Sequence, residues 1–99
     1  MDTERRKIFC RTMAVKLPSL RKISGLTQAE FADISGLSRQ TVSNIESGRI
    51  NLKWNTCLAF AFIFQAHPDT RAYMKAQGWE EVLRNELVYK YYAKVSLGD

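Results

Sequence analysis

Four polar side chains on one short segment have the chemistry to read the edges of nucleobases. The guanidinium of Arg39 matches the O6 and N7 acceptors of guanine, and the amides of Gln40 and Asn44 match the donor and acceptor of adenine. With Ser43, they share the outward face of a predicted helix at about Ser38–Ser47. The opposite side of that helix is apolar, through Val42 and Ile45. The alternative interpretation of the polar side is an ordinary solvated helix face.

A second short helix, immediately before this segment, is expected to hold it in place. Thr27 and Glu30 have the spacing of a capping box, in which each side chain accepts from the other's backbone N–H. Gly36 closes that helix, because glycine adopts a left-handed backbone at little steric cost. Ser38 is a favourable N-cap for the next helix. Two helices joined in this way form a helix-turn-helix, whose second helix can enter the DNA major groove.

These residues resemble the lambda-repressor-like family of helix-turn-helix proteins, the Cro/CI or XRE type. The resemblance is carried by Thr27-Gln28-Ala29-Glu30-Phe31-Ala32, Gly36-Leu37-Ser38 and Thr41-Val42-Ser43-Asn44-Ile45-Glu46-Ser47-Gly48-Arg49. It extends over residues 17–64, nearly half of the chain. It implies an all-α bundle of four to five short helices, to which this chain adds a C-terminal helical extension.

The resemblance also implies which side chains bind DNA phosphates. The glutamine at the position of Gln28 binds a phosphate in this family and braces the recognition helix. Arg49 matches a position that often contacts phosphate, and Lys53 is a further candidate. Thr41 points partly sideways and is expected to neighbour the phosphates. Glu46 is expected to be structural, as a capping or ion-pairing group with Arg49 as a candidate partner.

The N-terminal quarter carries the positive charge. Residues 1–24 hold seven Lys or Arg against two acids, which equals the formal net charge of +5 for all 99 residues. This surplus favours polyanionic partners such as DNA, RNA or an acidic membrane. Periodicity leaves open whether residues 1–16 form a basic arm, an extra helix or a frayed tail. The first helix of the bundle is expected from about Leu17 to Ser24, with Pro18 in its opening turn.

Two groups of cations in this region are candidates for contacts with DNA. The run Arg5-Arg6-Lys7 is expected either to follow a groove as an arm or to belong to a solubilising tail. The second group can reach phosphate, although no more than one of its members is expected to do so: Lys16, Arg21 and Lys22.

A helix from about Asn55 to Ala66 is expected to be apolar on all sides. Its inward stripe is Cys57, Phe60, Ala61 and Phe64. Phe62 and Ile63 lie outside that stripe, and burial of each would contribute about 1.5–3 kcal/mol. If they were exposed, they would form a patch that favours association. A covering surface is therefore expected.

The cover is expected from residues 67–99, a C-terminal helical extension that follows the helix-turn-helix domain at residues 17–66. It is predicted to contain a short helix, Thr70 to Gln77, and a longer one, Trp79 to Val95, with Glu80–Arg84 and Glu86–Lys90 pairs on its solvated side. The extension packs on its own chain, on a second copy, or on both. Together with the outer residues of the apolar helix, its stripe gives the candidate dimer or partner surface: Phe62, Ile63, Trp79, Leu83, Leu87 and Tyr91.

Composition argues against several other classes of protein. Two cysteines and one histidine have no metal-ligand spacing, so no metal and no cofactor is expected, and both cysteines are assigned to the core. No nucleophile and base assemble around His67, so the chain is not expected to be an enzyme. The longest apolar run is eight residues, whereas a membrane span needs about 20. No leader opens the chain, and a cytoplasmic location is expected.

The leading hypothesis is a sequence-specific DNA-binding transcription regulator, and in particular a repressor. It would act as a homodimer on an inverted repeat, with recognition helices about 34 Å apart in successive turns of the major groove. The alternative is an antitoxin or adaptor whose C-terminal extension binds a protein partner such as a toxin, with DNA binding for autoregulation. That alternative is motivated by the aromatic run of Tyr89, Tyr91 and Tyr92.

Overall fold

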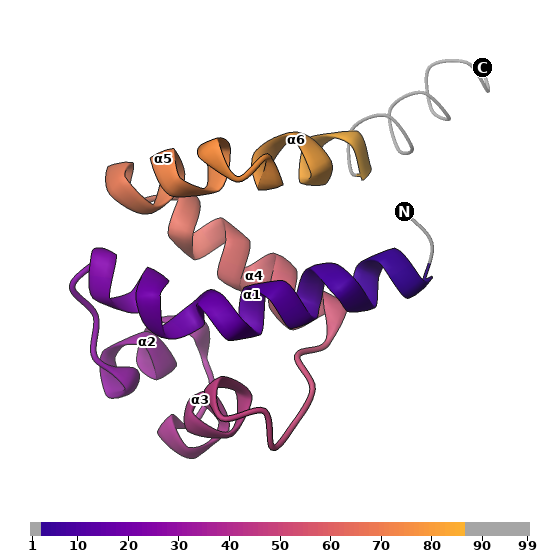
Figure 1. The fold of residues 1–99 in the computed structure, drawn as a ribbon. Helices are drawn as coiled ribbons and strands as arrows, with labels where there is room; N and C mark the ends of the chain where they lie inside the picture. Colours follow the sequence, from indigo (N-terminus) through magenta and orange to yellow (C-terminus); the bar gives the residue numbers. More distant parts are fainter. Residues whose placement is uncertain (1–2, 87–99) are drawn as a thin grey trace, which may run out of the picture.

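The computed structural model describes residues 3–86 and shows an all-α bundle, as the sequence predicts (Figure 1). Across this range the elements are α1 (Thr3–Ile23), α2 (Gln28–Ser35), α3 (Arg39–Glu46), α4 (Trp54–Gln65), α5 (Pro68–Ala76) and α6 (Trp79–Arg84). None of the helices in the described part is long and apolar enough to cross a membrane. The candidate surface residues Leu87 and Tyr91, and the tyrosine run around them, lie outside the described residues.

The first helix is longer than the sequence analysis predicts. It begins at Thr3 and not near Leu17, so Pro18 lies inside the helix and not in its opening turn. One buried stripe explains this, because it runs without interruption through both halves: Phe9, Cys10, Met13, Leu17 and Leu20. The packing of that stripe offsets the backbone hydrogen bond that proline cannot donate.

The α2–turn–α3 unit forms as its caps predict. Thr27 Oγ1 accepts from the Glu30 N–H at 3.1 Å, and Glu30 Oε1 accepts from the Thr27 N–H at 3.0 Å. Gly36 ends α2 with φ +75°, in the left-handed region. Ser38 Oγ then accepts from the Thr41 N–H at 3.0 Å and fixes the first turn of α3.

An aromatic cluster joins α2 to α4. The ring of Phe31 stacks on Phe64, with centroids 5.2 Å apart, and meets Phe60 edge-on at 4.8 Å. The predicted inward stripe of α4 is confirmed, because all four of its members are buried: Cys57, Phe60, Ala61 and Phe64. Burial raises the pKa of the Cys10 and Cys57 thiols, which suits core residues better than reactive ones.

The helices α5 and α6 pack on the chain's own bundle, above α4 and α1 in Figure 1. The indole of Trp79 meets Phe9 edge-on at 5.8 Å and Tyr73 at 5.7 Å. Trp79 and Leu83 are each only 8% exposed. This corrects their assignment to a docking surface, because side chains buried in their own core leave almost no area for a second copy.

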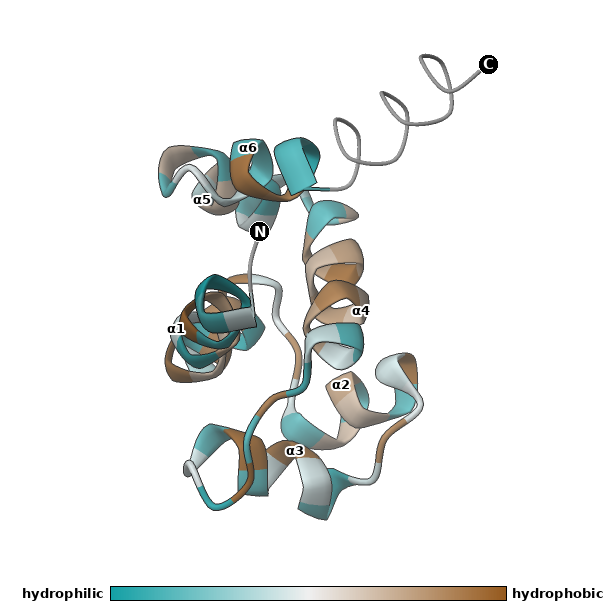
Figure 2. Ribbon diagram, turned by 90° about the vertical axis from the view of Figure 1, so that its right-hand side faces the viewer, coloured by the Kyte–Doolittle hydropathy of each residue, from teal (hydrophilic) through white to brown (hydrophobic). Residues whose placement is uncertain are grey.

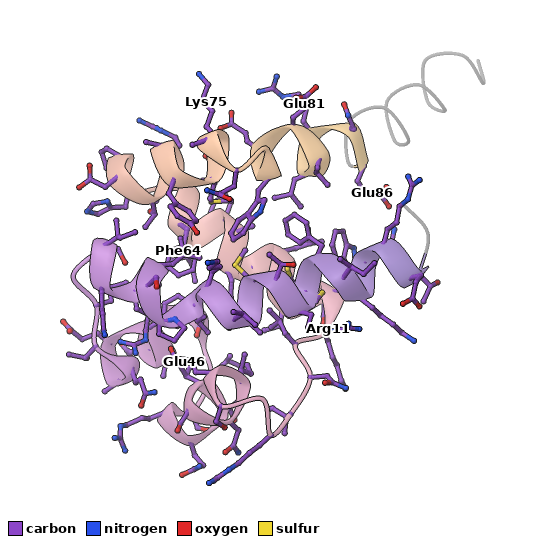
Figure 3. All side chains as sticks on the ribbon, in the orientation of Figure 1. Arg11, Glu46, Phe64, Lys75, Glu81 and Glu86 are labelled. Carbon is purple, nitrogen blue, oxygen red and sulfur yellow. The ribbon has the colours of Figure 1, made fainter. Side chains whose placement is uncertain are left out.

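An ion pair between the first and last described helices corrects two further expectations. Glu86 is buried instead of solvated, and its Oε1 lies 2.6 Å from Nη2 of Arg6. Figure 3 shows the Glu86 side chain extending from just after α6 toward the start of α1. The Arg6 guanidinium also lies 5.0 Å from the centre of the Trp54 ring. Arg6 is therefore a structural residue and not part of a free arm. The predicted Glu80–Arg84 pair is confirmed at 3.3 Å, and Lys90 lies outside the described residues.

Candidate nucleic-acid interface

The polar face of α3 is turned outward because two apolar side chains on the opposite face of the helix are packed in the core. Val42 is fully buried and Ile45 is 3% exposed, and both belong to the core. All four predicted base-reading side chains lie on α3. Arg39 and Gln40 are exposed, whereas Ser43 and Asn44 are half-buried. The face that carries them is therefore open to solvent at the start of the helix and partly shielded near its middle.

The two amides on this face are joined to each other. Gln40 Nε2 donates to Asn44 Oδ1 at 3.0 Å, one helical turn further on. The bond leaves Oε1 of Gln40 as an acceptor and Nδ2 of Asn44 as a donor, neither of which has a partner in the described part of the chain. One amide acceptor and one amide donor are the groups that complement the N6 donor and N7 acceptor on the major-groove edge of adenine.

The carboxylate of Glu46 connects the three helices around this face. Its two oxygens accept from Arg21 of α1, with Oε2 2.5 Å from Nε and Oε1 3.0 Å from Nη2. Gln28 of α2 donates to Oε1 at 3.0 Å. The Arg21 and Glu46 side chains are only 11% and 8% exposed, so this is a largely desolvated, bidentate pair. It fixes the end of α3 relative to α1 and to the start of α2.

The electrostatics of Glu46 follow from these contacts. Burial raises the pKa of this carboxyl, but the hydrogen bonds from Arg21 and Gln28, with the positive charge of Arg21, hold the pKa below its ordinary value. Glu46 is therefore ionised at neutral pH. Its structural role is as predicted, but its partner is Arg21 and not Arg49.

The candidate phosphate-binding residues fall into two groups. Gln28 and Thr41 are half-buried and engaged within the unit, Gln28 with Glu46 and Thr41 Oγ1 with Ser38 Oγ at 2.9 Å. Arg49 and Lys53 are exposed and form no side-chain hydrogen bond or ion pair with the described residues. Gln28 thus braces the recognition helix, as the resemblance implies, and it keeps a second amide hydrogen for a ligand.

The pairing of Arg21 and Glu46 is the feature that the sequence analysis did not identify. Arg21 appears there as one of three cations that can reach phosphate, and its guanidinium is instead bound by a carboxylate and by the Leu26 carbonyl at 3.0 Å. One feature of the sequence could have indicated this pair. Glu46 is the single acid in a helix whose other outward residues are neutral or basic.

The sequence that forms this arrangement matches the model of a known protein family. The family model described as a helix-turn-helix domain matches residues 12–74. The chain belongs to the helix-turn-helix domain family. The matched part of this helix-turn-helix protein runs from the middle of α1 into α5, and so contains the complete α2–turn–α3 unit. No curated protein and no solved structure matches the chain.

Membership in this family supports DNA binding and a regulatory role. The geometry agrees with that role, because the helix that would enter the groove is anchored on one side and open on the other. Among the described residues, no group of three or more His, Cys, Asp or Glu side chains is placed to hold a metal ion.

Proposed function

We propose that this helix-turn-helix protein is a sequence-specific transcription regulator, and a repressor, that inserts α3 into the DNA major groove. The observation that carries the proposal is the fixed polar face of α3, with Arg39 and Gln40 exposed and the Glu46 network behind it. The resemblance of residues 27–49 to the lambda-repressor-like family supports the same role.

Each side chain of this face has a proposed part in recognition. Arg39 donates to guanine, the Gln40–Asn44 pair reads adenine, and Ser43 contacts a neighbouring base. The phosphate backbone is bound by Gln28, Thr41, Arg49 and Lys53. Phosphate contacts then supply most of the affinity, and the logarithm of the binding constant falls steeply with the logarithm of salt concentration.

The outer face of α4 supports binding as a homodimer. Phe62 is 80% exposed there, and Ile63 beside it is half-buried. No residue of α4 is charged, so two copies of this face can meet without like charges opposing each other. Ala59 and Ala66 are exposed one turn on either side of Phe62, and their small size permits close approach.

The position of α4 relative to α3 suits a two-fold dimer on DNA. Figure 2 shows α4 on the flank opposite α1, with α3 at the lower end of the molecule. A two-fold axis along this flank would place both copies of α3 at the same end of the dimer. That is what binding to an inverted repeat requires, with half-sites about 34 Å apart.

Selection of bound duplexes from a random pool tests the proposal. We expect a palindromic consensus, which would report sequence specificity and two-fold symmetry together. The matched control is the variant with Arg39, Gln40 and Asn44 replaced by alanine, whose selected pool should show no consensus. A parent pool without any consensus would contradict sequence-specific binding.

The exposed Phe62 also supports the second candidate, an antitoxin or adaptor that presents this face to a protein partner. Sedimentation of the purified chain separates the two. A dimer favours the regulator, and a monomer that leaves Phe62 open favours a missing partner.

A further inference from the structure

The outward face of α1 contains a groove that the proposed function does not use. It is a shallow, open surface formed by side chains of α1 alone: Ile8, Arg11, Thr12, Val15 and Lys16. Ile8 is 52% exposed and Val15 is 68% exposed, whereas the opposite face of the same helix forms the core. These two side chains therefore contribute little to the stability of their own fold.

The cations of this groove are not neutralised by the protein itself. Arg11 and Lys16 form no hydrogen bond or ion pair with the described residues, in contrast to Arg6 and Arg21, which are both bound by carboxylates. The lining of the groove, as far as the structure describes it, contains no acidic side chain. Two unpaired positive charges therefore flank a patch that is otherwise apolar.

The groove extends across the N-terminal boundary of the helix-turn-helix match, with Thr12, Val15 and Lys16 inside the matched range. The helix-turn-helix match begins at residue 12, so Ile8 and Arg11 belong to the N-terminal extension of α1 that precedes it. Arg11 extends from the side of α1 that faces away from α5 and α6 (Figure 3). The extension of α1 thus supplies two of the five lining residues, Ile8 and Arg11.

We propose that this groove binds an acidic amphipathic helix of a partner protein. Ile8 and Val15 are two helical turns apart, about 10 Å, which matches apolar side chains repeated two turns apart on a partner helix. Thr12 between them is small and leaves room for the partner's side chains. Carboxylates beside the partner's apolar stripe would pair with Arg11 and Lys16.

Two other occupants fit the groove less well. A DNA backbone offers phosphates to Arg11 and Lys16 but no apolar surface to cover Ile8 and Val15. A second copy of the same groove would bring the cations of one copy against those of the other. An acidic amphipathic helix satisfies both features of the lining at once.

A peptide titration of the full chain tests the proposal. The probe is a fluorescein-labelled synthetic helix of about four turns, with leucines along one face and glutamates on its flanks. Its partner probe has the same composition in scrambled order, so that the leucines share no face. By fluorescence anisotropy, we expect the amphipathic probe to bind at least about tenfold more tightly than the scrambled one.

Variants of the groove locate the binding site. We expect Ile8→Ser with Val15→Ser, and separately Arg11→Glu with Lys16→Glu, to weaken binding of the amphipathic probe by about tenfold or more. The matched control is Arg71→Glu with Lys75→Glu, the same charge change on exposed residues of α5. Lys75 extends from the opposite side of the molecule (Figure 3), and this variant should bind within about twofold of the parent.

Three results would overturn the proposal. The parent would not bind the amphipathic probe, it would bind the scrambled probe equally tightly, or the α5 control variant would lose as much affinity as the groove variants. A further pattern would assign the groove to DNA phosphates. In it, the Arg11 and Lys16 variant alone loses affinity for DNA, and the Ile8 and Val15 variant binds the peptide as tightly as the parent. If a variant does not fold, the binding site can be located on the parent by NMR. Addition of the peptide should change the amide chemical shifts of residues 8–16 more than those of other residues. Failure here leaves the duplex selection unaffected, so the two proposals fail independently.

Discussion

The guanidinium of Arg21 in α1 donates two hydrogen bonds to the carboxylate of Glu46, the last residue of α3. The two side chains are 25 residues apart in the sequence and nearly excluded from solvent. The orientation of α3 therefore depends on a residue in a different helix.

Removing one partner of this pair should destabilise the fold strongly. We expect Glu46→Leu to lower the free energy of unfolding by about 3 kcal/mol, because it leaves the guanidinium of Arg21 desolvated without its counter-charge. The double variant Arg21→Met with Glu46→Leu should recover most of that loss, since no unpaired charge then remains. Urea unfolding of the parent, of the single variants Glu46→Leu and Arg21→Met, and of the double variant measures both effects. A double variant that loses the sum of the two single losses would show that the residues act independently.

The same carboxylate should make stability depend on pH. The pKa of Glu46 is lowered in the folded state, so the unfolded chain binds more protons as the solution is acidified. Its contribution is fully present above the ordinary glutamate pKa of about 4.3 and is lost as the pH falls through the lower folded value. Measured by urea unfolding below about pH 5, the free energy of unfolding should fall more steeply with decreasing pH for the parent than for Glu46→Gln. Glu81→Gln, an exposed carboxyl of α6, is the control and should keep the parent's slope.

The turn between α2 and α3 should tolerate only residues that adopt a left-handed backbone. Gly36 has φ +75°, and a Cβ atom placed there would meet no atom within 4 Å. The cost of Gly36→Ala is therefore backbone strain alone, and we expect a net loss of about 1 kcal/mol. Gly36→Asn should cost less, because asparagine enters this region more readily. Thermal unfolding distinguishes the two, and equal melting temperatures would contradict the assignment of strain.

Replacement of Arg39 and replacement of Arg49 by alanine should change DNA binding in different ways. Arg39→Ala should cost about 1–3 kcal/mol on the selected duplex and relax preference at one base pair. Arg49→Ala should weaken binding to all duplexes alike and reduce the salt slope by about 1. Titrations of specific and random duplexes at several salt concentrations separate the two roles. An Arg39→Ala protein that discriminates duplexes as well as the parent does would remove Arg39 from the base-reading set.

Phe62 should control assembly and leave the fold unchanged. Because Phe62 is 80% exposed, Phe62→Glu should change the free energy of unfolding of the monomer by no more than about 0.5 kcal/mol. Two glutamates facing each other across the proposed two-fold axis should dissociate the dimer. Sedimentation equilibrium measures this, with Val82→Glu on α6 as the control. A Phe62→Glu protein that remains dimeric would exclude the α4 face as the interface.

The helix-turn-helix was predictable because its determinants are local. Thr27, Glu30, Gly36 and Ser38 act within one or two turns of their own position, so the sequence specifies these caps without reference to the rest of the fold. The apolar stripe of α4 was predictable for the same reason, since helical periodicity places its members on one side.

The errors have two physical causes. Pro18 indicated a helix start, but the stripe from Phe9 to Leu20 passes through it, and tertiary packing overrides a local preference. The ion pairs Arg6–Glu86 and Arg21–Glu46 join residues 80 and 25 positions apart. Such pairs depend on how helices are placed in space, which no local pattern specifies.

The contact of Arg6 with Glu86 and with the ring of Trp54 has a consequence for how the molecule unfolds. Because it closes a loop across almost the whole described chain, it couples the end of α6 to the first turns of α1. Deleting the first eight residues should therefore release α6 as well, and amide hydrogens of these two distant segments should exchange at a common rate.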